Sequence, residues 1–295
     1  MSQHDELSAA IERGLVAEDA VERLDIAWSL LPRLVGSVNG LLVLVAGCSS
    51  RRRGVGRDVS VALMVRIANL FDSVLALGPR YESSLILLRC LTESAINLIY
   101  LGEAEDRSQM AQRFKQASLY EDRLILAALD RHEPPLDGAK RMMGSLLGEA
   151  ARNISSVRLA HKDDRTWSDD ASVEARARRI AREDLYDHVY RPLSSCVHGR
   201  WAALAALSLQ REEGKGWSPR LDHGRIHVGF AVTACWIALQ AADAYLSLAG
   251  TSAASRLRKP VSEFIDLVES LDRMASGNHR ARQPLGLASE EGTPR

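Results

Sequence analysis

The segment Ser83–Leu101 (SSLILLRCLTESAINLIYL) constrains the fold more than any other part of this sequence. Its apolar residues occupy nearly every side of a helix, and such a helix is buried among other elements. It nevertheless contains Arg89 and Glu93, which lie four residues apart and so share one helix face. An unpaired buried charge is strongly unfavourable, so we expect these two side chains to pair or to find other partners. The sequence therefore predicts a central, buried helix with a polar face.

Apolar residues also recur at helical spacing through most of the remaining chain. Clusters of proline and glycine separate several of these stripes. The stripes cover residues 7–31, 60–77, 107–129, 139–154, 198–209, 226–248 and 257–271. This pattern predicts an all-α protein built as a multi-helix bundle.

The domain organisation follows from where the stripes stop. We expect an N-terminal helical region over residues 1–59 and a main helical domain over residues 60–275. Residues 276–295 contain too few apolar side chains to pack. The sequence therefore predicts a single domain with a flexible, disordered C-terminal tail.

Residues 28–47 (WSLLPRLVGSVNGLLVLVAG) come closest to a membrane span. A span needs about 20 predominantly apolar residues, whereas Pro32, Arg33, Ser37 and Asn39 interrupt this run. We expect instead a buried helix with a break between residues 36 and 40, and no membrane span.

The overall composition excludes several classes of function. The 38 basic and 38 acidic residues balance, so the chain as a whole does not attract nucleic acids or anionic membranes. The four cysteines are far apart and lack the spacing of zinc sites, which favours reduced thiols. No glycine-rich phosphate loop is present. We expect a cytoplasmic protein without a metal or other cofactor.

A second unusual segment is YRPLSSCVHGRW, residues 190–201. Pro192 has no backbone N–H, so it either begins a helix or kinks one that arrives from about residue 184. We expect a helix from Pro192 to about residue 209. Four arginines in the preceding segment VEARARRIARED (residues 173–184) are either a path for RNA or, as the charge pattern favours, a solvated face.

Arg191, Ser194 and His198 would face the same way on this helix. Arg191 and His198 are seven residues apart, which corresponds to two turns and about 10.5 Å of rise, so both can reach one phosphate. Arginine binds phosphate through two hydrogen bonds, and histidine transfers protons near neutral pH. These groups suffice for metal-free RNA cleavage, in which the ribose 2′-hydroxyl attacks the adjacent phosphate. One interpretation is therefore a catalytic site with Ser194 in an orienting role.

The alternative interpretation is structural. Tyr186, Tyr190, Ser194 and His198 follow one another at intervals of four, and such a ladder also forms a hydrogen-bonded seam between helices. The catalytic interpretation places Arg191 and His198 at an open cleft with basic rims, whereas the seam encloses and pairs them. The polar residues of the central helix would line the pocket or join the seam: Arg89, Glu93, Asn97 and Tyr100.

The same residues carry a resemblance to a bacterial family of helical proteins of unknown function. Its members share R-x-x-x-E followed by an aromatic-Leu pair, then a Trp before a basic helix, then Y-x-x-x-Y-R-x-x-S-x-x-x-H-G. The resemblance covers about residues 60–209 and brings no established activity. The corresponding residues here are Arg89, Glu93, Tyr100, Leu101, Trp167, Tyr186, Tyr190, Arg191, Ser194, His198 and Gly199.

The spacing of Arg191 and His198 (R-x6-H) also resembles the signature of the HEPN superfamily, which includes metal-independent endoribonucleases of toxin and defence systems. Pro192 departs from the polar residue that commonly follows the arginine in that superfamily. The resemblance implies RNA as a partner and a homodimer, because HEPN sites are usually completed across two subunits. The sequence leaves two hypotheses: a HEPN-like ribonuclease or RNA-binding protein of a bacterial stress or defence system, and a non-catalytic helical scaffold.

Overall fold

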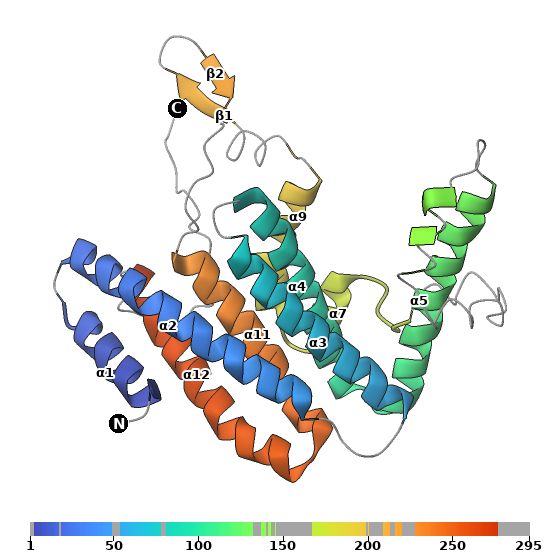
Figure 1. Ribbon diagram of the computed structural model, residues 1–295, viewed down its shortest axis with the longest axis horizontal. Helices are drawn as coiled ribbons and strands as arrows, with labels where there is room; N and C mark the ends of the chain where they lie inside the picture. The colour runs from blue at the N-terminus through green and yellow to red at the C-terminus, as the bar shows by residue number, and fades with distance from the viewer. Residues whose placement is uncertain are drawn as a thin grey trace.

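A computed structural model shows how the chain folds (Figure 1). It describes residues 3–17, 19–48, 54–77, 81–131, 137–139, 141–142, 145, 167–198, 200, 209–212, 216–219 and 228–276. The expected tail beyond Ser276 and most of the stripe at residues 139–154 lie outside these ranges.

Within the described residues the chain is a bundle of helices with one short hairpin, which confirms the prediction of an all-α multi-helix fold. The helices are α1 (Gln3–Leu15), α2 (Ala20–Gly47), α3 (Val55–Ala76), α4 (Tyr81–Glu103), α5 (Arg107–Asp130), α7 (Val173–Arg179), α8 (Glu183–Leu185), η2 (Tyr186–Tyr190), α9 (Arg191–Val197), α11 (Val228–Ala249) and α12 (Ser252–Ser276). The strands β1 (Leu209–Glu212) and β2 (Gly216–Pro219) pair in antiparallel fashion.

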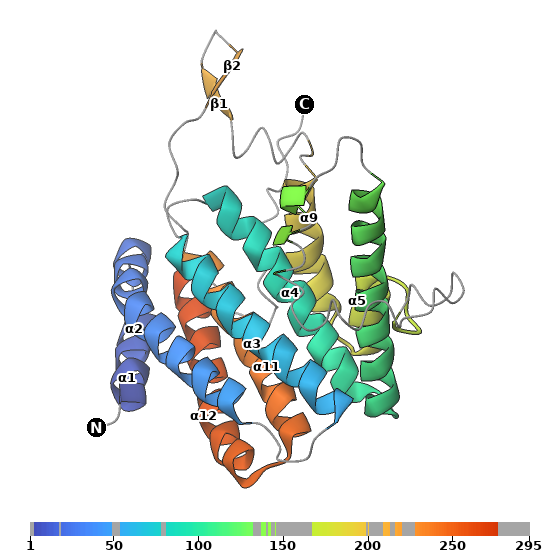
Figure 2. The same ribbon diagram turned by 45° about the vertical axis from the view of Figure 1, so that its right-hand side comes forward.

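Helix α11 occupies the middle of the bundle. It packs against α2, α3, α4 and α12, and its side chains are buried almost all round (Figures 1 and 2). Its neighbour α4 contacts α3, α5 and α11 and also α7, η2 and α9. The sequence prediction that residues 83–101 form a central, buried helix is therefore confirmed.

The helices of the expected N-terminal region pack directly on the rest of the bundle. Helix α1 contacts α2 and α12, while α2 contacts α3, α11 and α12. The expected break near residues 36–40 is wrong, because α2 runs without interruption from Ala20 to Gly47. Each glycine weakens a helix by about 1 kcal/mol, but Leu34, Val38 and Leu42 of α2 are completely buried. Packing of this apolar face outweighs the low helix propensity of Gly36 and Gly40.

In the part of the chain that the structure describes, four helical segments are long and apolar enough to cross a membrane. They are Val21–Gly47, Val55–Ala76, Ser83–Glu103 and Val228–Ala249. This finding concerns length and composition alone, so the expectation of a cytoplasmic protein without a membrane span stays a prediction.

A carboxyl group in α12 makes the stability of the bundle depend on pH. Burial, together with the negative charge of Glu269, raises the pKa of Asp272 from 3.8 to about 6. The folded protein therefore holds a proton that the unfolded chain releases, and stability falls as the pH rises from about 4 through 6. We expect Asp272→Asn to stabilise the protein at pH 7.5 by about 1–2 kcal/mol, after allowance for solvent screening, and to have little effect at pH 4.

Urea unfolding of wild type and variant at both pH values measures this difference. Asp266→Asn is the matched control, because Asp266 is an exposed aspartate of the same helix. Equal effects of the two substitutions at pH 7.5 would contradict the assignment of the destabilising charge to Asp272.

Candidate functional site

The candidate site is built on one helix with a widened turn. Helices α8, η2 and α9 follow each other without a gap from Glu183 to Val197, and η2 is a π-helical turn. Its last bond runs from the backbone N–H of Arg191 to the carbonyl of Tyr186, five residues earlier. We attribute this turn to Pro192, which cannot donate to the carbonyl four residues earlier and would collide with it in a regular α-helix. The proline therefore modifies an arriving helix rather than beginning a new one.

The expected extension of this helix to residue 209 is wrong. Helix α9 ends at Val197, and Leu209 already belongs to β1; residues 201–208 lie outside the described part of the chain. The backbone N–H of Arg200 donates to the carbonyl of Ser195 at 3.0 Å, as in the Schellman motif that ends helices. That motif favours glycine at the position before Arg200, and Gly199 stands there in the sequence. This glycine indicated the end of the helix, but the apolar stripe at residues 198–209 suggested that the helix continues.

Arg89 of α4 connects to the inner side of this helix, and we call Arg89, Glu93, Tyr190 and Ser194 the Arg89 cluster. Arg89 Nε donates to Ser194 Oγ at 3.1 Å, and Nη2 donates to the Tyr190 hydroxyl at 2.6 Å. The guanidinium also lies over the Tyr190 ring, 4.7 Å from its centre. Three contacts from one side chain thus hold the helix Glu183–Val197 against α4.

Glu93 balances the charge of Arg89. Its Oε2 lies 3.7 Å from Arg89 Nη1 and accepts a longer hydrogen bond of 3.5 Å from the Tyr190 hydroxyl. Burial and the Glu93 charge raise the pKa of Tyr190, so the phenol stays protonated and can donate. Tyr186 stacks on Tyr190 with ring centres 5.6 Å apart. The two charges that the sequence places on one helix face therefore meet as expected, with Tyr190 as their common neighbour.

Arg191 and His198 lie outside this cluster. The Arg191 side chain is 69% exposed, and its nearest carboxylate partner is Asp187 at 3.9 Å. His198 follows the last residue of α9 and is also exposed. The structure thus separates the predicted catalytic group: Ser194 contacts Arg89, while Arg191 and His198 face solvent. Their catalytic roles stay predictions.

Tyr100 lies two turns beyond Glu93 on α4 and begins a second set of polar contacts. Its hydroxyl donates to Asp170 Oδ2 at 2.9 Å. Trp167 meets the rings of Tyr100 and Phe114 edge-on, with centres 5.5 and 4.9 Å apart. The segment before α7 is thereby fixed against α4 and α5.

Arg176 of α7 is the residue that sequence analysis missed. Neither a solvated face nor a path for RNA describes it, because it is only 7% exposed. It lies over the ring of Trp167 and donates to Ser168 Oγ at 3.3 Å and to the Asp170 carbonyl at 3.4 Å. Burial lowers its pKa, while the charge of Glu93 opposes that shift. Arg176 stands in a segment rich in arginine, and such a segment usually lies at the surface. The sequence pattern therefore gave no sign that this arginine is buried.

Of the neighbouring arginines, one contacts other helices and another is exposed to solvent. Arg182 donates to Asp184 at 3.0 Å and to Gln240 at 3.1 Å, which connects this region to α11. Arg178 is 66% exposed and pairs with Glu174. The four arginines therefore do not form one basic surface.

Asn97 extends the polar face of α4 one turn beyond Glu93. Its Oδ1 and the Nε of Arg176 are both buried and have no hydrogen-bond partner among the residues described. Both atoms leave capacity for a further polar group near α4 and α7. No group of three or more His, Cys, Asp or Glu residues in the described ranges is arranged to hold a metal ion.

Removal of the Arg89 side chain tests whether the Arg89 cluster holds the fold together. Arg89→Met leaves Glu93 and Tyr190 partly buried without their cation, so we expect a loss of about 1–3 kcal/mol in the free energy of unfolding. Arg178→Met removes an exposed i,i+4 ion pair and should change stability by less than about 0.5 kcal/mol. Urea denaturation compares the two, and equal effects would show that the cluster does not stabilise the fold.

Comparison with known proteins places these residues in a family. No curated protein and no solved structure gives a match. The family of unknown function DUF5677 matches residues 57–216, from α3 to the start of β2, and this range contains the Arg89 cluster, Arg191 and His198. Because the match covers more than half of the 295 residues, the chain belongs to this family.

Proposed function

We propose that this protein binds RNA and cleaves it without a metal ion, with Arg191 and His198 as the groups that act on the phosphate. The observation that carries the proposal is the exposure of Arg191 on a helix whose inner side is held by Arg89, and of His198 directly after the end of that helix. Such a helix presents the two side chains to a large substrate without any rearrangement of the core. The R-x6-H resemblance to HEPN proteins supports the same reaction.

Each group has a separate role in the proposed reaction. Arg191 holds the scissile phosphate, since its planar guanidinium donates two hydrogen bonds at once. Its 3.9 Å pair with Asp187 is exposed and is readily exchanged for a phosphate. His198 moves the proton between the ribose 2′-hydroxyl, the leaving oxygen and water. Ser194 acts indirectly in this scheme, because its hydroxyl accepts from Arg89 and donates to the Tyr190 carbonyl.

A homodimer belongs to this proposal. HEPN-like sites are usually completed by two subunits, and one chain supplies a single exposed arginine and histidine from this motif. A second copy would double these groups around one substrate.

A non-catalytic scaffold is the second candidate function. It is favoured by the bonds that Tyr190 and Ser194 make to Arg89, because these two residues of the tyrosine–serine ladder serve packing between helices. In this case the Arg89 cluster exists to position a surface for a partner, and Arg191 and His198 have no chemical role.

Metal-free cleavage of a mixed RNA pool in the presence of a chelator separates the two candidates. We expect cleavage by the wild type, and a loss of about a hundredfold or more in Arg191→Ala and in His198→Ala. His188→Ala is the matched control, since His188 is an exposed histidine of the same helix and should be dispensable. Circular dichroism checks that all variants are folded.

RNA binding is measured on the same proteins by filter retention at two salt concentrations. Binding without cleavage would retain the RNA-binding part of the proposal and reject the reaction. Absence of both, with folded protein, would reject the proposal and favour the scaffold.

A further inference from the structure

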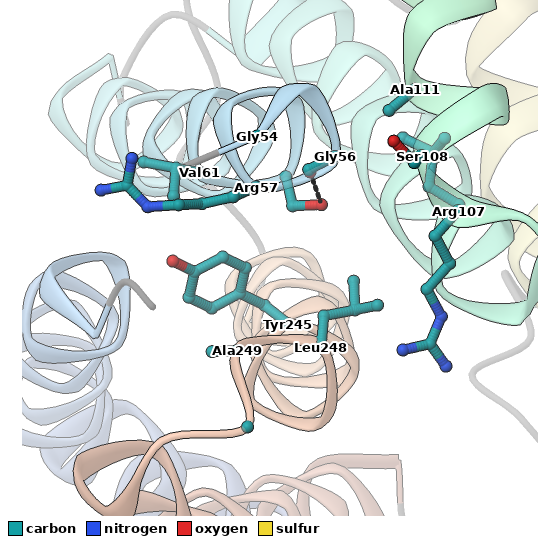
Figure 3. Close-up of a pocket in the computed structure, with 13 residues that line it drawn as sticks. Gly54, Gly56, Arg57, Val61, Arg107, Ser108, Ala111, Tyr245, Leu248 and Ala249 are labelled. Carbon is teal, nitrogen blue, oxygen red and sulfur yellow. Dashed lines mark hydrogen bonds between the residues drawn. The ribbon is translucent and has the colours of Figure 1, made fainter. Parts of the chain in front are cut away.

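A cavity of about 770 Å³ lies at the end of the bundle where α3 and α5 begin and α4 and α11 end (Figure 3). Leu101, which lines it, is twelve residues from Arg89 along α4, a rise of about 18 Å. The cavity is therefore separate from the Arg89 cluster and from Arg191 and His198. Its volume is in the range typical of small-molecule sites, roughly 300–1,000 Å³.

The lining divides into an apolar part and a polar part. Figure 3 shows Tyr245 and Leu248 of α11 projecting towards the first turn of α3. Tyr245 is 2% exposed, and its hydroxyl donates to the Cys48 carbonyl at 3.2 Å, so its ring rather than its hydroxyl is presented to the cavity. The apolar lining residues are Val61, Leu101, Ala111, Tyr245, Leu248 and Ala249.

The polar part of the lining is basic. It contains Arg57 and Arg107, two serines and glycine backbone, but no carboxylate among the described lining residues. In Figure 3 the two arginines lie on either side of the cavity, one from α3 and one from α5. The nearby carboxylates of Asp58 and Asp106 are exposed and do not line it. Asp58 pairs with Arg57 at 3.0 Å on the solvent side.

The positions of both arginines add to an existing positive field. Arg107 is the first residue of α5 and Arg57 the third residue of α3, and helix N-termini carry partial positive charge that disfavours cations. In α3 the N-cap residue Gly54 makes no side-chain capping bond, whereas at the start of α5 the Asp106 carboxylate accepts from the backbone N–H of Gln109 at 2.9 Å. Among the described residues, the start of α3 is therefore the one of these two helix starts without a side-chain cap.

We propose that this cavity binds an amphipathic organic anion. Its apolar body would lie against Leu101, Tyr245 and Leu248, and its carboxylate or phosphate head would lie at the start of α3, within reach of the Arg57 and Arg107 side chains. Guanidinium groups and helix N-termini both recognise such heads. This site is independent of the proposed action on RNA.

Isothermal titration with four probes tests the proposal: dodecanoate, dodecyl phosphate, dodecanol and inorganic phosphate, with the amphiphiles below micelle-forming concentrations. We expect at least one of the two anionic amphiphiles to bind saturably at one site, and the better of the two identifies the head group. Dodecanol and inorganic phosphate each lack half of the required chemistry and should bind at least tenfold more weakly.

Variants locate the binding in this cavity. Arg57→Ala and Arg107→Ala should each weaken the anionic amphiphile about tenfold or more, because each removes a charged hydrogen-bond donor. Ala249→Trp occupies space in the cavity without a change in charge and should weaken binding as well. Arg131→Ala, an exposed arginine just beyond the other end of α5, is the matched control and should bind like the wild type.

Two results would overturn the proposal. One is the absence of saturable binding of both anionic amphiphiles to folded wild-type protein. The other is binding that Arg57→Ala, Arg107→Ala and Ala249→Trp leave unchanged. Neither result depends on RNA cleavage, and loss of RNA cleavage would leave the binding assay unaffected.

Discussion

Arg89 has to find acceptors inside the bundle, because α3, α11 and the helix Glu183–Val197 enclose α4 around it. It finds them in Glu93 on its own helix and in Tyr190 and Ser194 on the facing helix. This requirement ties two segments together that are about a hundred residues apart in sequence. The position of the candidate site, on the far side of the second helix, depends on that connection.

The widened turn at Tyr186–Tyr190 shows how a local constraint serves this arrangement. Pro192 cannot continue a regular helix with four-residue spacing, and the π-helical turn removes the conflict without a break in the helix. The helix remains continuous, so Tyr190 and Ser194 can both contact Arg89 from consecutive turns. Arg191, next to Tyr190 in sequence, consequently faces solvent.

The cavity near the C-terminal end of α4 differs from the Arg89 cluster in how its charged residues are arranged. There Arg57 and Arg107 lie at the starts of α3 and α5, beside an apolar surface supplied by α11, and Arg57 pairs with the exposed Asp58. Tyr245 and Leu248 lie outside the matched family range, whereas Arg57 and Arg107 lie within it. The site therefore exists only when the C-terminal helices pack against the family region.

The helical class, the burial of α4 and the meeting of Arg89 with Glu93 could be predicted from the sequence. They depend on periodicity and on neighbours within one helix, both of which the sequence displays directly. The glycine before Arg200, which favours the end of a helix, was also present in the sequence, but the apolar residues after it resemble a continued helix. The apolar stripe at residues 198–209 favoured a longer helix, although the glycine indicated that the helix ends before it.

The sequence by itself determined that the chain folds as helices and that Arg191, Ser194 and His198 follow one another on one short segment. Only the tertiary structure decided that Ser194 faces α4 while Arg191 and His198 face water, that α2 continues through its glycines, and that Arg176 is buried. The reason is physical: these outcomes depend on contacts between segments far apart in sequence. Spacing along the chain defines a helix face, but the packing of neighbouring helices decides whether that face meets protein or solvent.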